Sequence, residues 1–92
     1  ELFLSGHDHD YERFAPQTPG GQADSTRGIR QFVVGTGGKN LSAFGSVQPN
    51  SELRVNDTFG ALEIKLNPGS YEWSLLGTGS KTAADSGFSL CH

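Results

Sequence analysis

Two neighbouring segments alternate apolar and polar residues with a period of two, and this pattern constrains the fold more than any other. The apolar positions are Leu62, Ile64 and Leu66 in the first segment and Tyr71, Trp73 and Leu75 in the second. Between them lies Asn67-Pro68-Gly69-Ser70, which is typical of a turn because Pro fixes φ and Gly accepts a positive φ. Side chains of a β-strand alternate between its two faces. The sequence therefore predicts a β-hairpin over about residues 58–77, with one apolar and one solvated face.

The rest of the chain is rich in residues that interrupt regular structure. Of its 92 residues, 13 are Gly and 4 are Pro, and no window shows the apolar spacing of a helix. Short apolar runs predict buried strands at Leu2–Leu4 and Ile29–Val34, and a last short strand at Phe88–Leu90. We expect a surface loop over residues 15–28, mostly loop over residues 39–57, and at most a turn at residues 83–85. The predicted fold class is mainly β.

Charge and hydropathy exclude several classes of function. The net charge is −3 and there is no basic run, which argues against nucleic acid as a partner. No run approaches the ~18 apolar residues of a membrane-spanning helix, so no membrane partner is expected. The first residues lack the basic region of a signal peptide, and Met is absent throughout, so we interpret Glu1 as a cut end. A chain of this size buries only about 60–65% of its unfolded surface, which also indicates a piece of a larger protein.

The side chains that could carry chemistry are concentrated in residues 6–13, which run Gly-His-Asp-His-Asp-Tyr-Glu-Arg. His7 and His9 lie here among three carboxylates, directly after an apolar strand. In extended backbone, residues i and i+2 point to the same side, so the two imidazoles are expected to project together from Cα atoms about 7 Å apart. Neutral imidazole is the commonest metal ligand, and nearby carboxylates can orient its ring N–H. The spacing predicts that His7 and His9 bind one metal ion or two adjacent ones, with incidental surface histidines as the alternative.

Residues 4–13 resemble the last Gly-His-x-His block of the calcineurin-like metallophosphoesterases, and the Tyr-Glu-Arg that follows resembles the purple acid phosphatase branch of that family. The strand at 29–38 with its Gly-Thr-Gly-Gly turn, the hairpin and the tail are also similar to that branch. The resemblance implies the C-terminal part of a four-layer α/β/β/α sandwich that hydrolyses phosphate esters. It implies two divalent or trivalent ions of iron, zinc or manganese, with His7 and His9 as ligands of different ions.

The resemblance also implies that these 92 residues hold only part of the site. The family's Asp-x-His, Gly-Asp-x-x-(Asp or Tyr) and Gly-Asn-His blocks are missing, so the other ligands are expected upstream, in the remainder of the catalytic domain. The chain alone, with its metal-ligand loop over residues 5–14, is expected to be inactive. By resemblance to secreted relatives, Cys91 is expected to pair with an upstream cysteine, and the protein to be extracellular.

Several assignments stay open from the sequence. Tyr11, Glu12 and Arg13 either lie beside the metals and the substrate or make ordinary structural bonds. The glycines of residues 35–38 either approach a phosphate or form a tight turn, which we favour. Trp73 with Tyr71 is either a stacking platform or, as we favour, core.

Two other classes of protein remain as alternatives. A cupin-like mononuclear metalloenzyme also uses His-x-His, but its Glu follows after three or four residues, whereas two separate His9 from Glu12. The second alternative is a non-catalytic β-sandwich accessory module.

Overall fold

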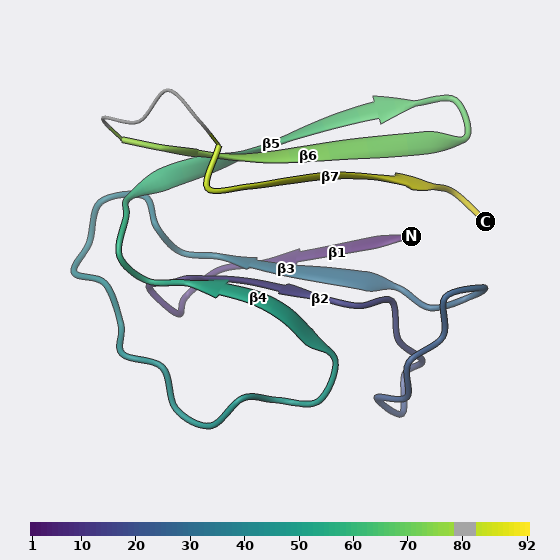
Figure 1. The fold of residues 1–92 in the computed structure, drawn as a ribbon, viewed down its shortest axis with the longest axis horizontal. Coiled ribbons are helices and arrows are strands. Elements are labelled where there is room, and N and C mark those ends of the chain that lie inside the picture. Colours follow the sequence, from purple (N-terminus) through teal and green to yellow (C-terminus); the bar gives the residue numbers. More distant parts are fainter. Residues whose placement is uncertain (79–82) are drawn as a thin grey trace.

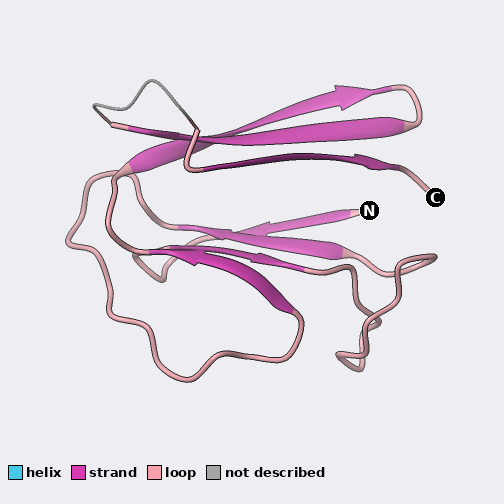
Figure 2. Cartoon of the chain, viewed as in Figure 1, coloured by secondary structure: helices cyan, strands magenta, loops and turns pink. Residues whose placement is uncertain are grey.

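A computed structural model describes residues 1–78 and 83–92, which form seven strands in two stacked sheets (Figure 1). The strands are β1 (Leu2–Ser5), β2 (Tyr11–Phe14), β3 (Arg30–Val34), β4 (Ser51–Val55), β5 (Gly60–Asn67), β6 (Ser70–Gly77) and β7 (Asp85–Leu90). None of the described residues is helical (Figure 2). The predicted mainly β class is therefore confirmed, and these residues contain no helix of the length and apolarity needed to cross a membrane.

The first sheet has the order β1-β3-β2-β4, with β1 parallel to β3 and β2 antiparallel to both of its neighbours. Because β1 and β3 are parallel, their carboxyl ends lie at the same end of the sheet (Figure 1). The loop that carries His7 and His9 follows β1, and the glycine turn at residues 35–38 follows β3. The topology thus brings these two segments side by side.

The second sheet has the order β5-β6-β7 and contains the predicted hairpin. β5 and β6 pair without interruption from Gly60 opposite Gly77 to Asn67 opposite Ser70. Gly69 has a φ of 80°, the positive value that a Pro-Gly turn needs and that glycine tolerates. The hairpin prediction is confirmed.

The core lies between the sheets and is mainly aromatic. Its buried members are Tyr11 and Phe32 from the first sheet and Tyr71, Trp73 and Leu75 from the second. The rings of Phe32 and Trp73 meet edge to face, with centroids 5.5 Å apart. The interpretation of Tyr71 and Trp73 as core is therefore confirmed.

Three strand predictions need correction. Residues 51–55, expected as loop, form β4, because Leu53 and Val55 pack against the core through the pairing of β4 with β2. The last strand begins at Asp85, where only a turn was expected. The strand at Leu2–Leu4 is not buried, since β1 lies at the edge of its sheet with Phe3 57% and Leu4 56% exposed.

Candidate metal centre

The loop that carries the two histidines is shorter than the expected loop over residues 5–14, because Ser5 ends β1 and β2 begins at Tyr11. β3 lies between β1 and β2 in the sheet, so this loop, residues 6–10, must cross the end of β3. His7 has a φ of 78°, which is uncommon for a residue other than Gly, and the Asp10 N–H donates to the Asp8 carbonyl oxygen at 2.8 Å. The backbone from His7 to Asp10 is thus turned and not extended. The expected projection of both imidazoles from an extended segment is wrong.

Gly35 allows the loop to cross β3 closely. Its N–H donates to the Asp10 carbonyl oxygen at 2.9 Å, and a Cβ at this position would lie 1.8 Å from the Asp8 carbonyl oxygen. Next to it, the buried Thr36 exchanges hydrogen bonds with the main chain of Gly60, which ties the glycine turn to β5. The glycine at position 35 is therefore required for close packing between the loop and the turn.

The His9 side chain is held in one orientation by the segment that follows the glycine turn. Its Nδ1 lies 2.7 Å from the carbonyl oxygen of Asn40. A carbonyl oxygen only accepts hydrogen bonds, so Nδ1 carries a proton, and the neutral ring then has its lone pair on Nε2. The main chain of His9 also donates to Ser42 Oγ at 3.0 Å and accepts from the Ser42 N–H at 2.8 Å. A backbone carbonyl on the second ring nitrogen is the arrangement found at metal-ligating histidines.

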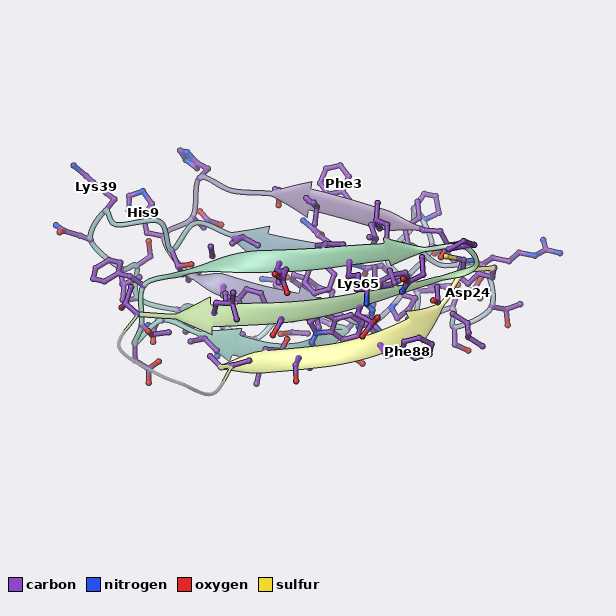
Figure 3. The ribbon with its side chains drawn as sticks, turned by 90° about the horizontal axis from the view of Figure 1, so that it is seen from above. Phe3, His9, Asp24, Lys39, Lys65 and Phe88 are labelled. Atoms are coloured by element: carbon purple, nitrogen blue, oxygen red, sulfur yellow. The ribbon has the colours of Figure 1, made fainter. Side chains whose placement is uncertain are left out.

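His7 is exposed on the same loop, and Figure 3 shows His9 and Lys39 at one end of the molecule. Across residues 1–78 and 83–92, no three His, Cys, Asp or Glu side chains are grouped so that they could hold a metal ion. The structure therefore places His7 and His9 on one short loop without further ligands from the described residues around them.

The acidic residues of the segment line a separate cleft together with Arg54. Asp10 is 8% exposed, and burial, followed by the nearby carboxylates of Asp8 and Glu12, raises its pKa. Glu12 accepts a hydrogen bond from Ser51 Oγ at 2.5 Å, so this side chain links β2 to β4. Of the two roles considered for Glu12, this hydrogen bond corresponds to the ordinary structural one.

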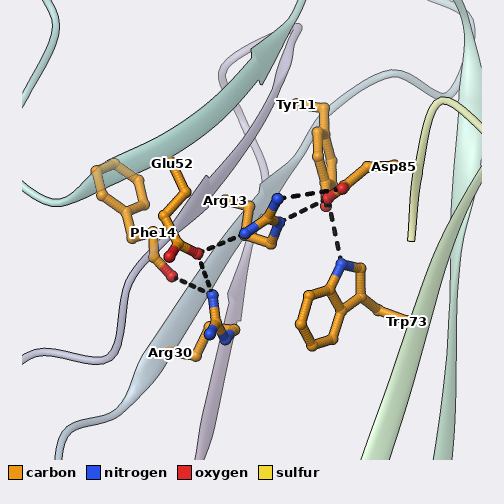
Figure 4. A network of polar contacts seen from close by, with 7 residues as sticks. All are labelled: Tyr11, Arg13, Phe14, Arg30, Glu52, Trp73 and Asp85. Carbon is orange, nitrogen blue, oxygen red and sulfur yellow. Dashed lines mark hydrogen bonds and ion pairs between the residues drawn. The ribbon is translucent and has the colours of Figure 1, made fainter. Parts of the chain in front are cut away.

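Tyr11 and Arg13 point between the sheets, where both contact Asp85 (Figure 4). The Tyr11 hydroxyl donates to Asp85 Oδ2 at 2.5 Å, and Arg13 donates through Nε at 2.7 Å and through its terminal nitrogen at 3.2 Å. Trp73 Nε1 donates to the same carboxylate at 3.2 Å. Tyr11 and Arg13 therefore also make structural bonds, and the carboxylate that joins them was not identified in the sequence.

The charge state of this network follows from its contacts. Burial and then the hydrogen bond to Asp85 raise the pKa of the Tyr11 hydroxyl far above its ordinary value. Burial alone would lower the pKa of the Arg13 guanidinium, but its hydrogen bond and charge attraction to Asp85 outweigh this and raise the pKa. Tyr11 is thus neutral and Arg13 charged at neutral pH. Loss of one partner from a fully buried ion pair typically costs about 3–5 kcal/mol, and a smaller loss is expected here because the Arg13 side chain is only part-buried.

Arg30 extends the network on the other side of Arg13. Both guanidiniums contact Glu52, and Arg30 also donates to the Phe14 carbonyl oxygen at 2.9 Å. They lie over the Trp73 ring, 5.4 Å from its centroid for Arg13 and 4.9 Å for Arg30. Arg30 is itself buried among these groups.

Comparisons of the chain with protein-family models, with curated proteins and with solved structures find no match.

Proposed function

We propose that this chain is part of a metal-dependent phosphoesterase in which His7 and His9 bind different ions of a dinuclear centre. The remaining ligands would come from elsewhere in the polypeptide. The observation that carries the proposal is the His9 ring, whose Nδ1 proton is held by the Asn40 carbonyl oxygen so that the Nε2 lone pair is available to a cation. This ring lies within residues 6–13, the segment that resembles the Gly-His-x-His-x-Tyr-Glu-Arg block of the purple acid phosphatase branch.

The fold around the loop supports the same proposal. The loop follows a strand of a parallel pair, and ligand sites of α/β sheets lie beyond the carboxyl ends of such strands. β1 carries apolar side chains on both faces, with Phe3 and Leu4 both exposed. Strands that are apolar on both faces are typical of parallel sheets covered on both sides. We propose that β1 has further neighbours in a complete four-layer α/β/β/α sandwich.

In this mechanism the described residues bind and orient. Ions of iron, zinc or manganese in such a centre supply positive charge that lowers the pKa of water and neutralises phosphate oxygens during in-line displacement. His9 would offer Nε2 from a ring whose orientation Asn40 holds, and His7 would offer a ring from the exposed side of the same loop. Gly35 keeps the loop packed on β3. The substrate would be a phosphate ester.

The proposed location is outside the cell, by the same resemblance. Cys91 is free and exposed, so its thiol is accessible to a cysteine elsewhere in the protein.

The proposal is tested with His7→Ala and His9→Ala in the full-length protein, with His92→Ala as the matched control. Each of the first two variants is expected to lose most of its bound metal by elemental analysis and most of its hydrolysis of an aryl phosphate. His92 lies at the other end of the chain and contacts Glu1, so its replacement should change neither. Wild-type metal content and turnover in both loop variants would contradict the proposal. An accessory module would contain no metal before any substitution.

A further inference from the structure

We infer that Asp85 is a positioning residue for the proposed metal centre, because through Tyr11 it ties the loop that carries His7 and His9 to the second sheet. The inference rests on the proposed function and adds a residue to its machinery. Asp85 lies 74 residues after Tyr11 in the chain and in the other sheet.

Tyr11 connects the loop to the core. It is the first residue of β2, with only Asp10 between it and His9, and its side chain is fully buried. Its hydroxyl ends on Asp85 Oδ2 at 2.5 Å (Figure 4). A displacement of this phenol would move the backbone that leads directly into His9.

Asp85 is built to hold that phenol in place. Its side chain is 5% exposed, and its carboxylate accepts from β2 through Tyr11 and Arg13 and from β6 through Trp73. An ionised carboxylate only accepts, so every one of these contacts is attractive. Charge-assisted hydrogen bonds of this kind are about twice as strong as neutral ones. Arg13 and Trp73 therefore fix the carboxylate, and the carboxylate fixes Tyr11.

The other contacts that hold the loop come from residues that follow β3 in the chain. Gly35 binds the Asp10 carbonyl oxygen, and Asn40 and Ser42 bind His9. These contacts fix the position of the loop relative to β3, whereas Asp85 fixes the position of β2 and the loop relative to the second sheet. Metal sites require their ligands to lie within about 0.5 Å of the productive geometry, so the attachment through Tyr11 matters for binding.

Two variants of the full-length protein cut this attachment by different chemistry. Asp85→Asn keeps the size of the side chain but removes its charge and turns an amide N–H₂ toward the donors. Tyr11→Phe removes only the hydroxyl, and it carries the test if Asp85→Asn does not fold. Each is expected to raise the dissociation constant for Zn²⁺, measured by equilibrium dialysis, roughly tenfold, the lower end of what outer contacts of metal ligands contribute. The double variant should bind Zn²⁺ as tightly as the single variant with the weaker binding. Both substitutions remove the same link, the one between Tyr11 and Asp85.

The control is Leu75→Val, which thins the core without touching the polar network. Leu75 is fully buried and pairs with Asp85 across β6 and β7. It should lower the urea midpoint of unfolding and leave the Zn²⁺ dissociation constant unchanged. Equal weakening of Zn²⁺ binding in this control, or unchanged binding in both Asp85→Asn and Tyr11→Phe, would overturn the positioning role. A wild-type protein that binds no Zn²⁺ would overturn both the proposed function and the positioning role of Asp85. Zn²⁺ binding that needs His7 and His9 but not Asp85 would overturn only the positioning role.

Discussion

Gly35 lies so close to Asp8 that a Cβ at position 35 would stand 1.8 Å from the Asp8 carbonyl oxygen. This contact exists because β3 lies between β1 and β2 in the sheet. The loop that joins β1 to β2 must therefore pass over the end of β3. The hydrogen bond from the Gly35 N–H to the Asp10 carbonyl oxygen closes the crossing. The loop with the two histidines and the turn after β3 are therefore one packed unit.

Gly35→Ala in the full-length protein should displace the loop, because the obstructing atom belongs to the main chain and cannot rotate away. The free energy of unfolding is expected to fall by about 1–3 kcal/mol, as for other overpacked sites, and Zn²⁺ binding by the proposed metal centre is expected to weaken. Urea unfolding and equilibrium dialysis measure the two effects. Gly37→Ala is the matched control, since a Cβ there meets no atom within 4 Å. Identical results for the two variants would show that the crossing is not tightly packed.

Gly87→Ala should destabilise the second sheet. A Cβ at position 87 would lie 2.2 Å from the Trp73 ring, which Phe32 holds from the other sheet at a centroid distance of 5.5 Å. The ring has little room to move, so the free energy of unfolding is expected to fall by about 1–3 kcal/mol. Gly45→Ala, at a position with open space, is the control for urea unfolding. An unchanged midpoint for Gly87→Ala would contradict the packing of Trp73 on β7.

Asp24 should titrate below an ordinary aspartate. Its carboxylate accepts the N–H groups of Arg27 and Thr26, each at 3.0 Å, and these bonds lower its pKa. Because the pKa is lower in the folded than in the unfolded chain, the bonds stabilise the turn above the unfolded value of about 3.9 and are lost as the pH falls through the folded value. Carboxyl-carbon NMR of the protein, assigned with Asp24→Asn, measures the midpoint. A midpoint at or above the ordinary value would refute the turn.

The 92 residues alone are expected to melt broadly. β1 has one free edge and leaves Phe3 and Leu4 exposed, so the strand before the loop lacks part of the burial that would stabilise it. Differential scanning calorimetry of the isolated chain measures the transition. A sharp, cooperative melt would show that the two sheets suffice.

The hairpin and the positions of β1 and β3 in the chain were predictable because their signals are local. Alternation over β5 and β6 and the Pro-Gly turn between them are properties of adjacent residues. β4 was missed because its pairing with β2 and its packing on the core are long-range contacts that no short pattern indicates. Asp85 was missed for the same reason, since its partners Tyr11 and Arg13 lie more than 70 residues away.

The candidate ligands of the proposed site stand out in the sequence, but the geometry of the loop that carries them could not be predicted. His7 and His9 stand out by composition, but the extended backbone assumed between them fails because the loop must cross β3, and strand order is not encoded in a local pattern. The contact from Asn40 to His9 uses a main-chain carbonyl oxygen, which every residue carries. No side-chain type could have marked it.

The link between Tyr11 and Asp85 also sets an order of events during synthesis. Ribosomes add about 5–20 residues per second, so Asp85, which lies 74 residues after Tyr11, is made about 4–15 s later. Throughout that interval His7 and His9 have already been made, while the carboxylate that anchors the start of β2 beside them does not yet exist. A cation captured early would meet a loop without its final support, so in the proposed metal centre we expect the ions to bind after the second sheet is complete.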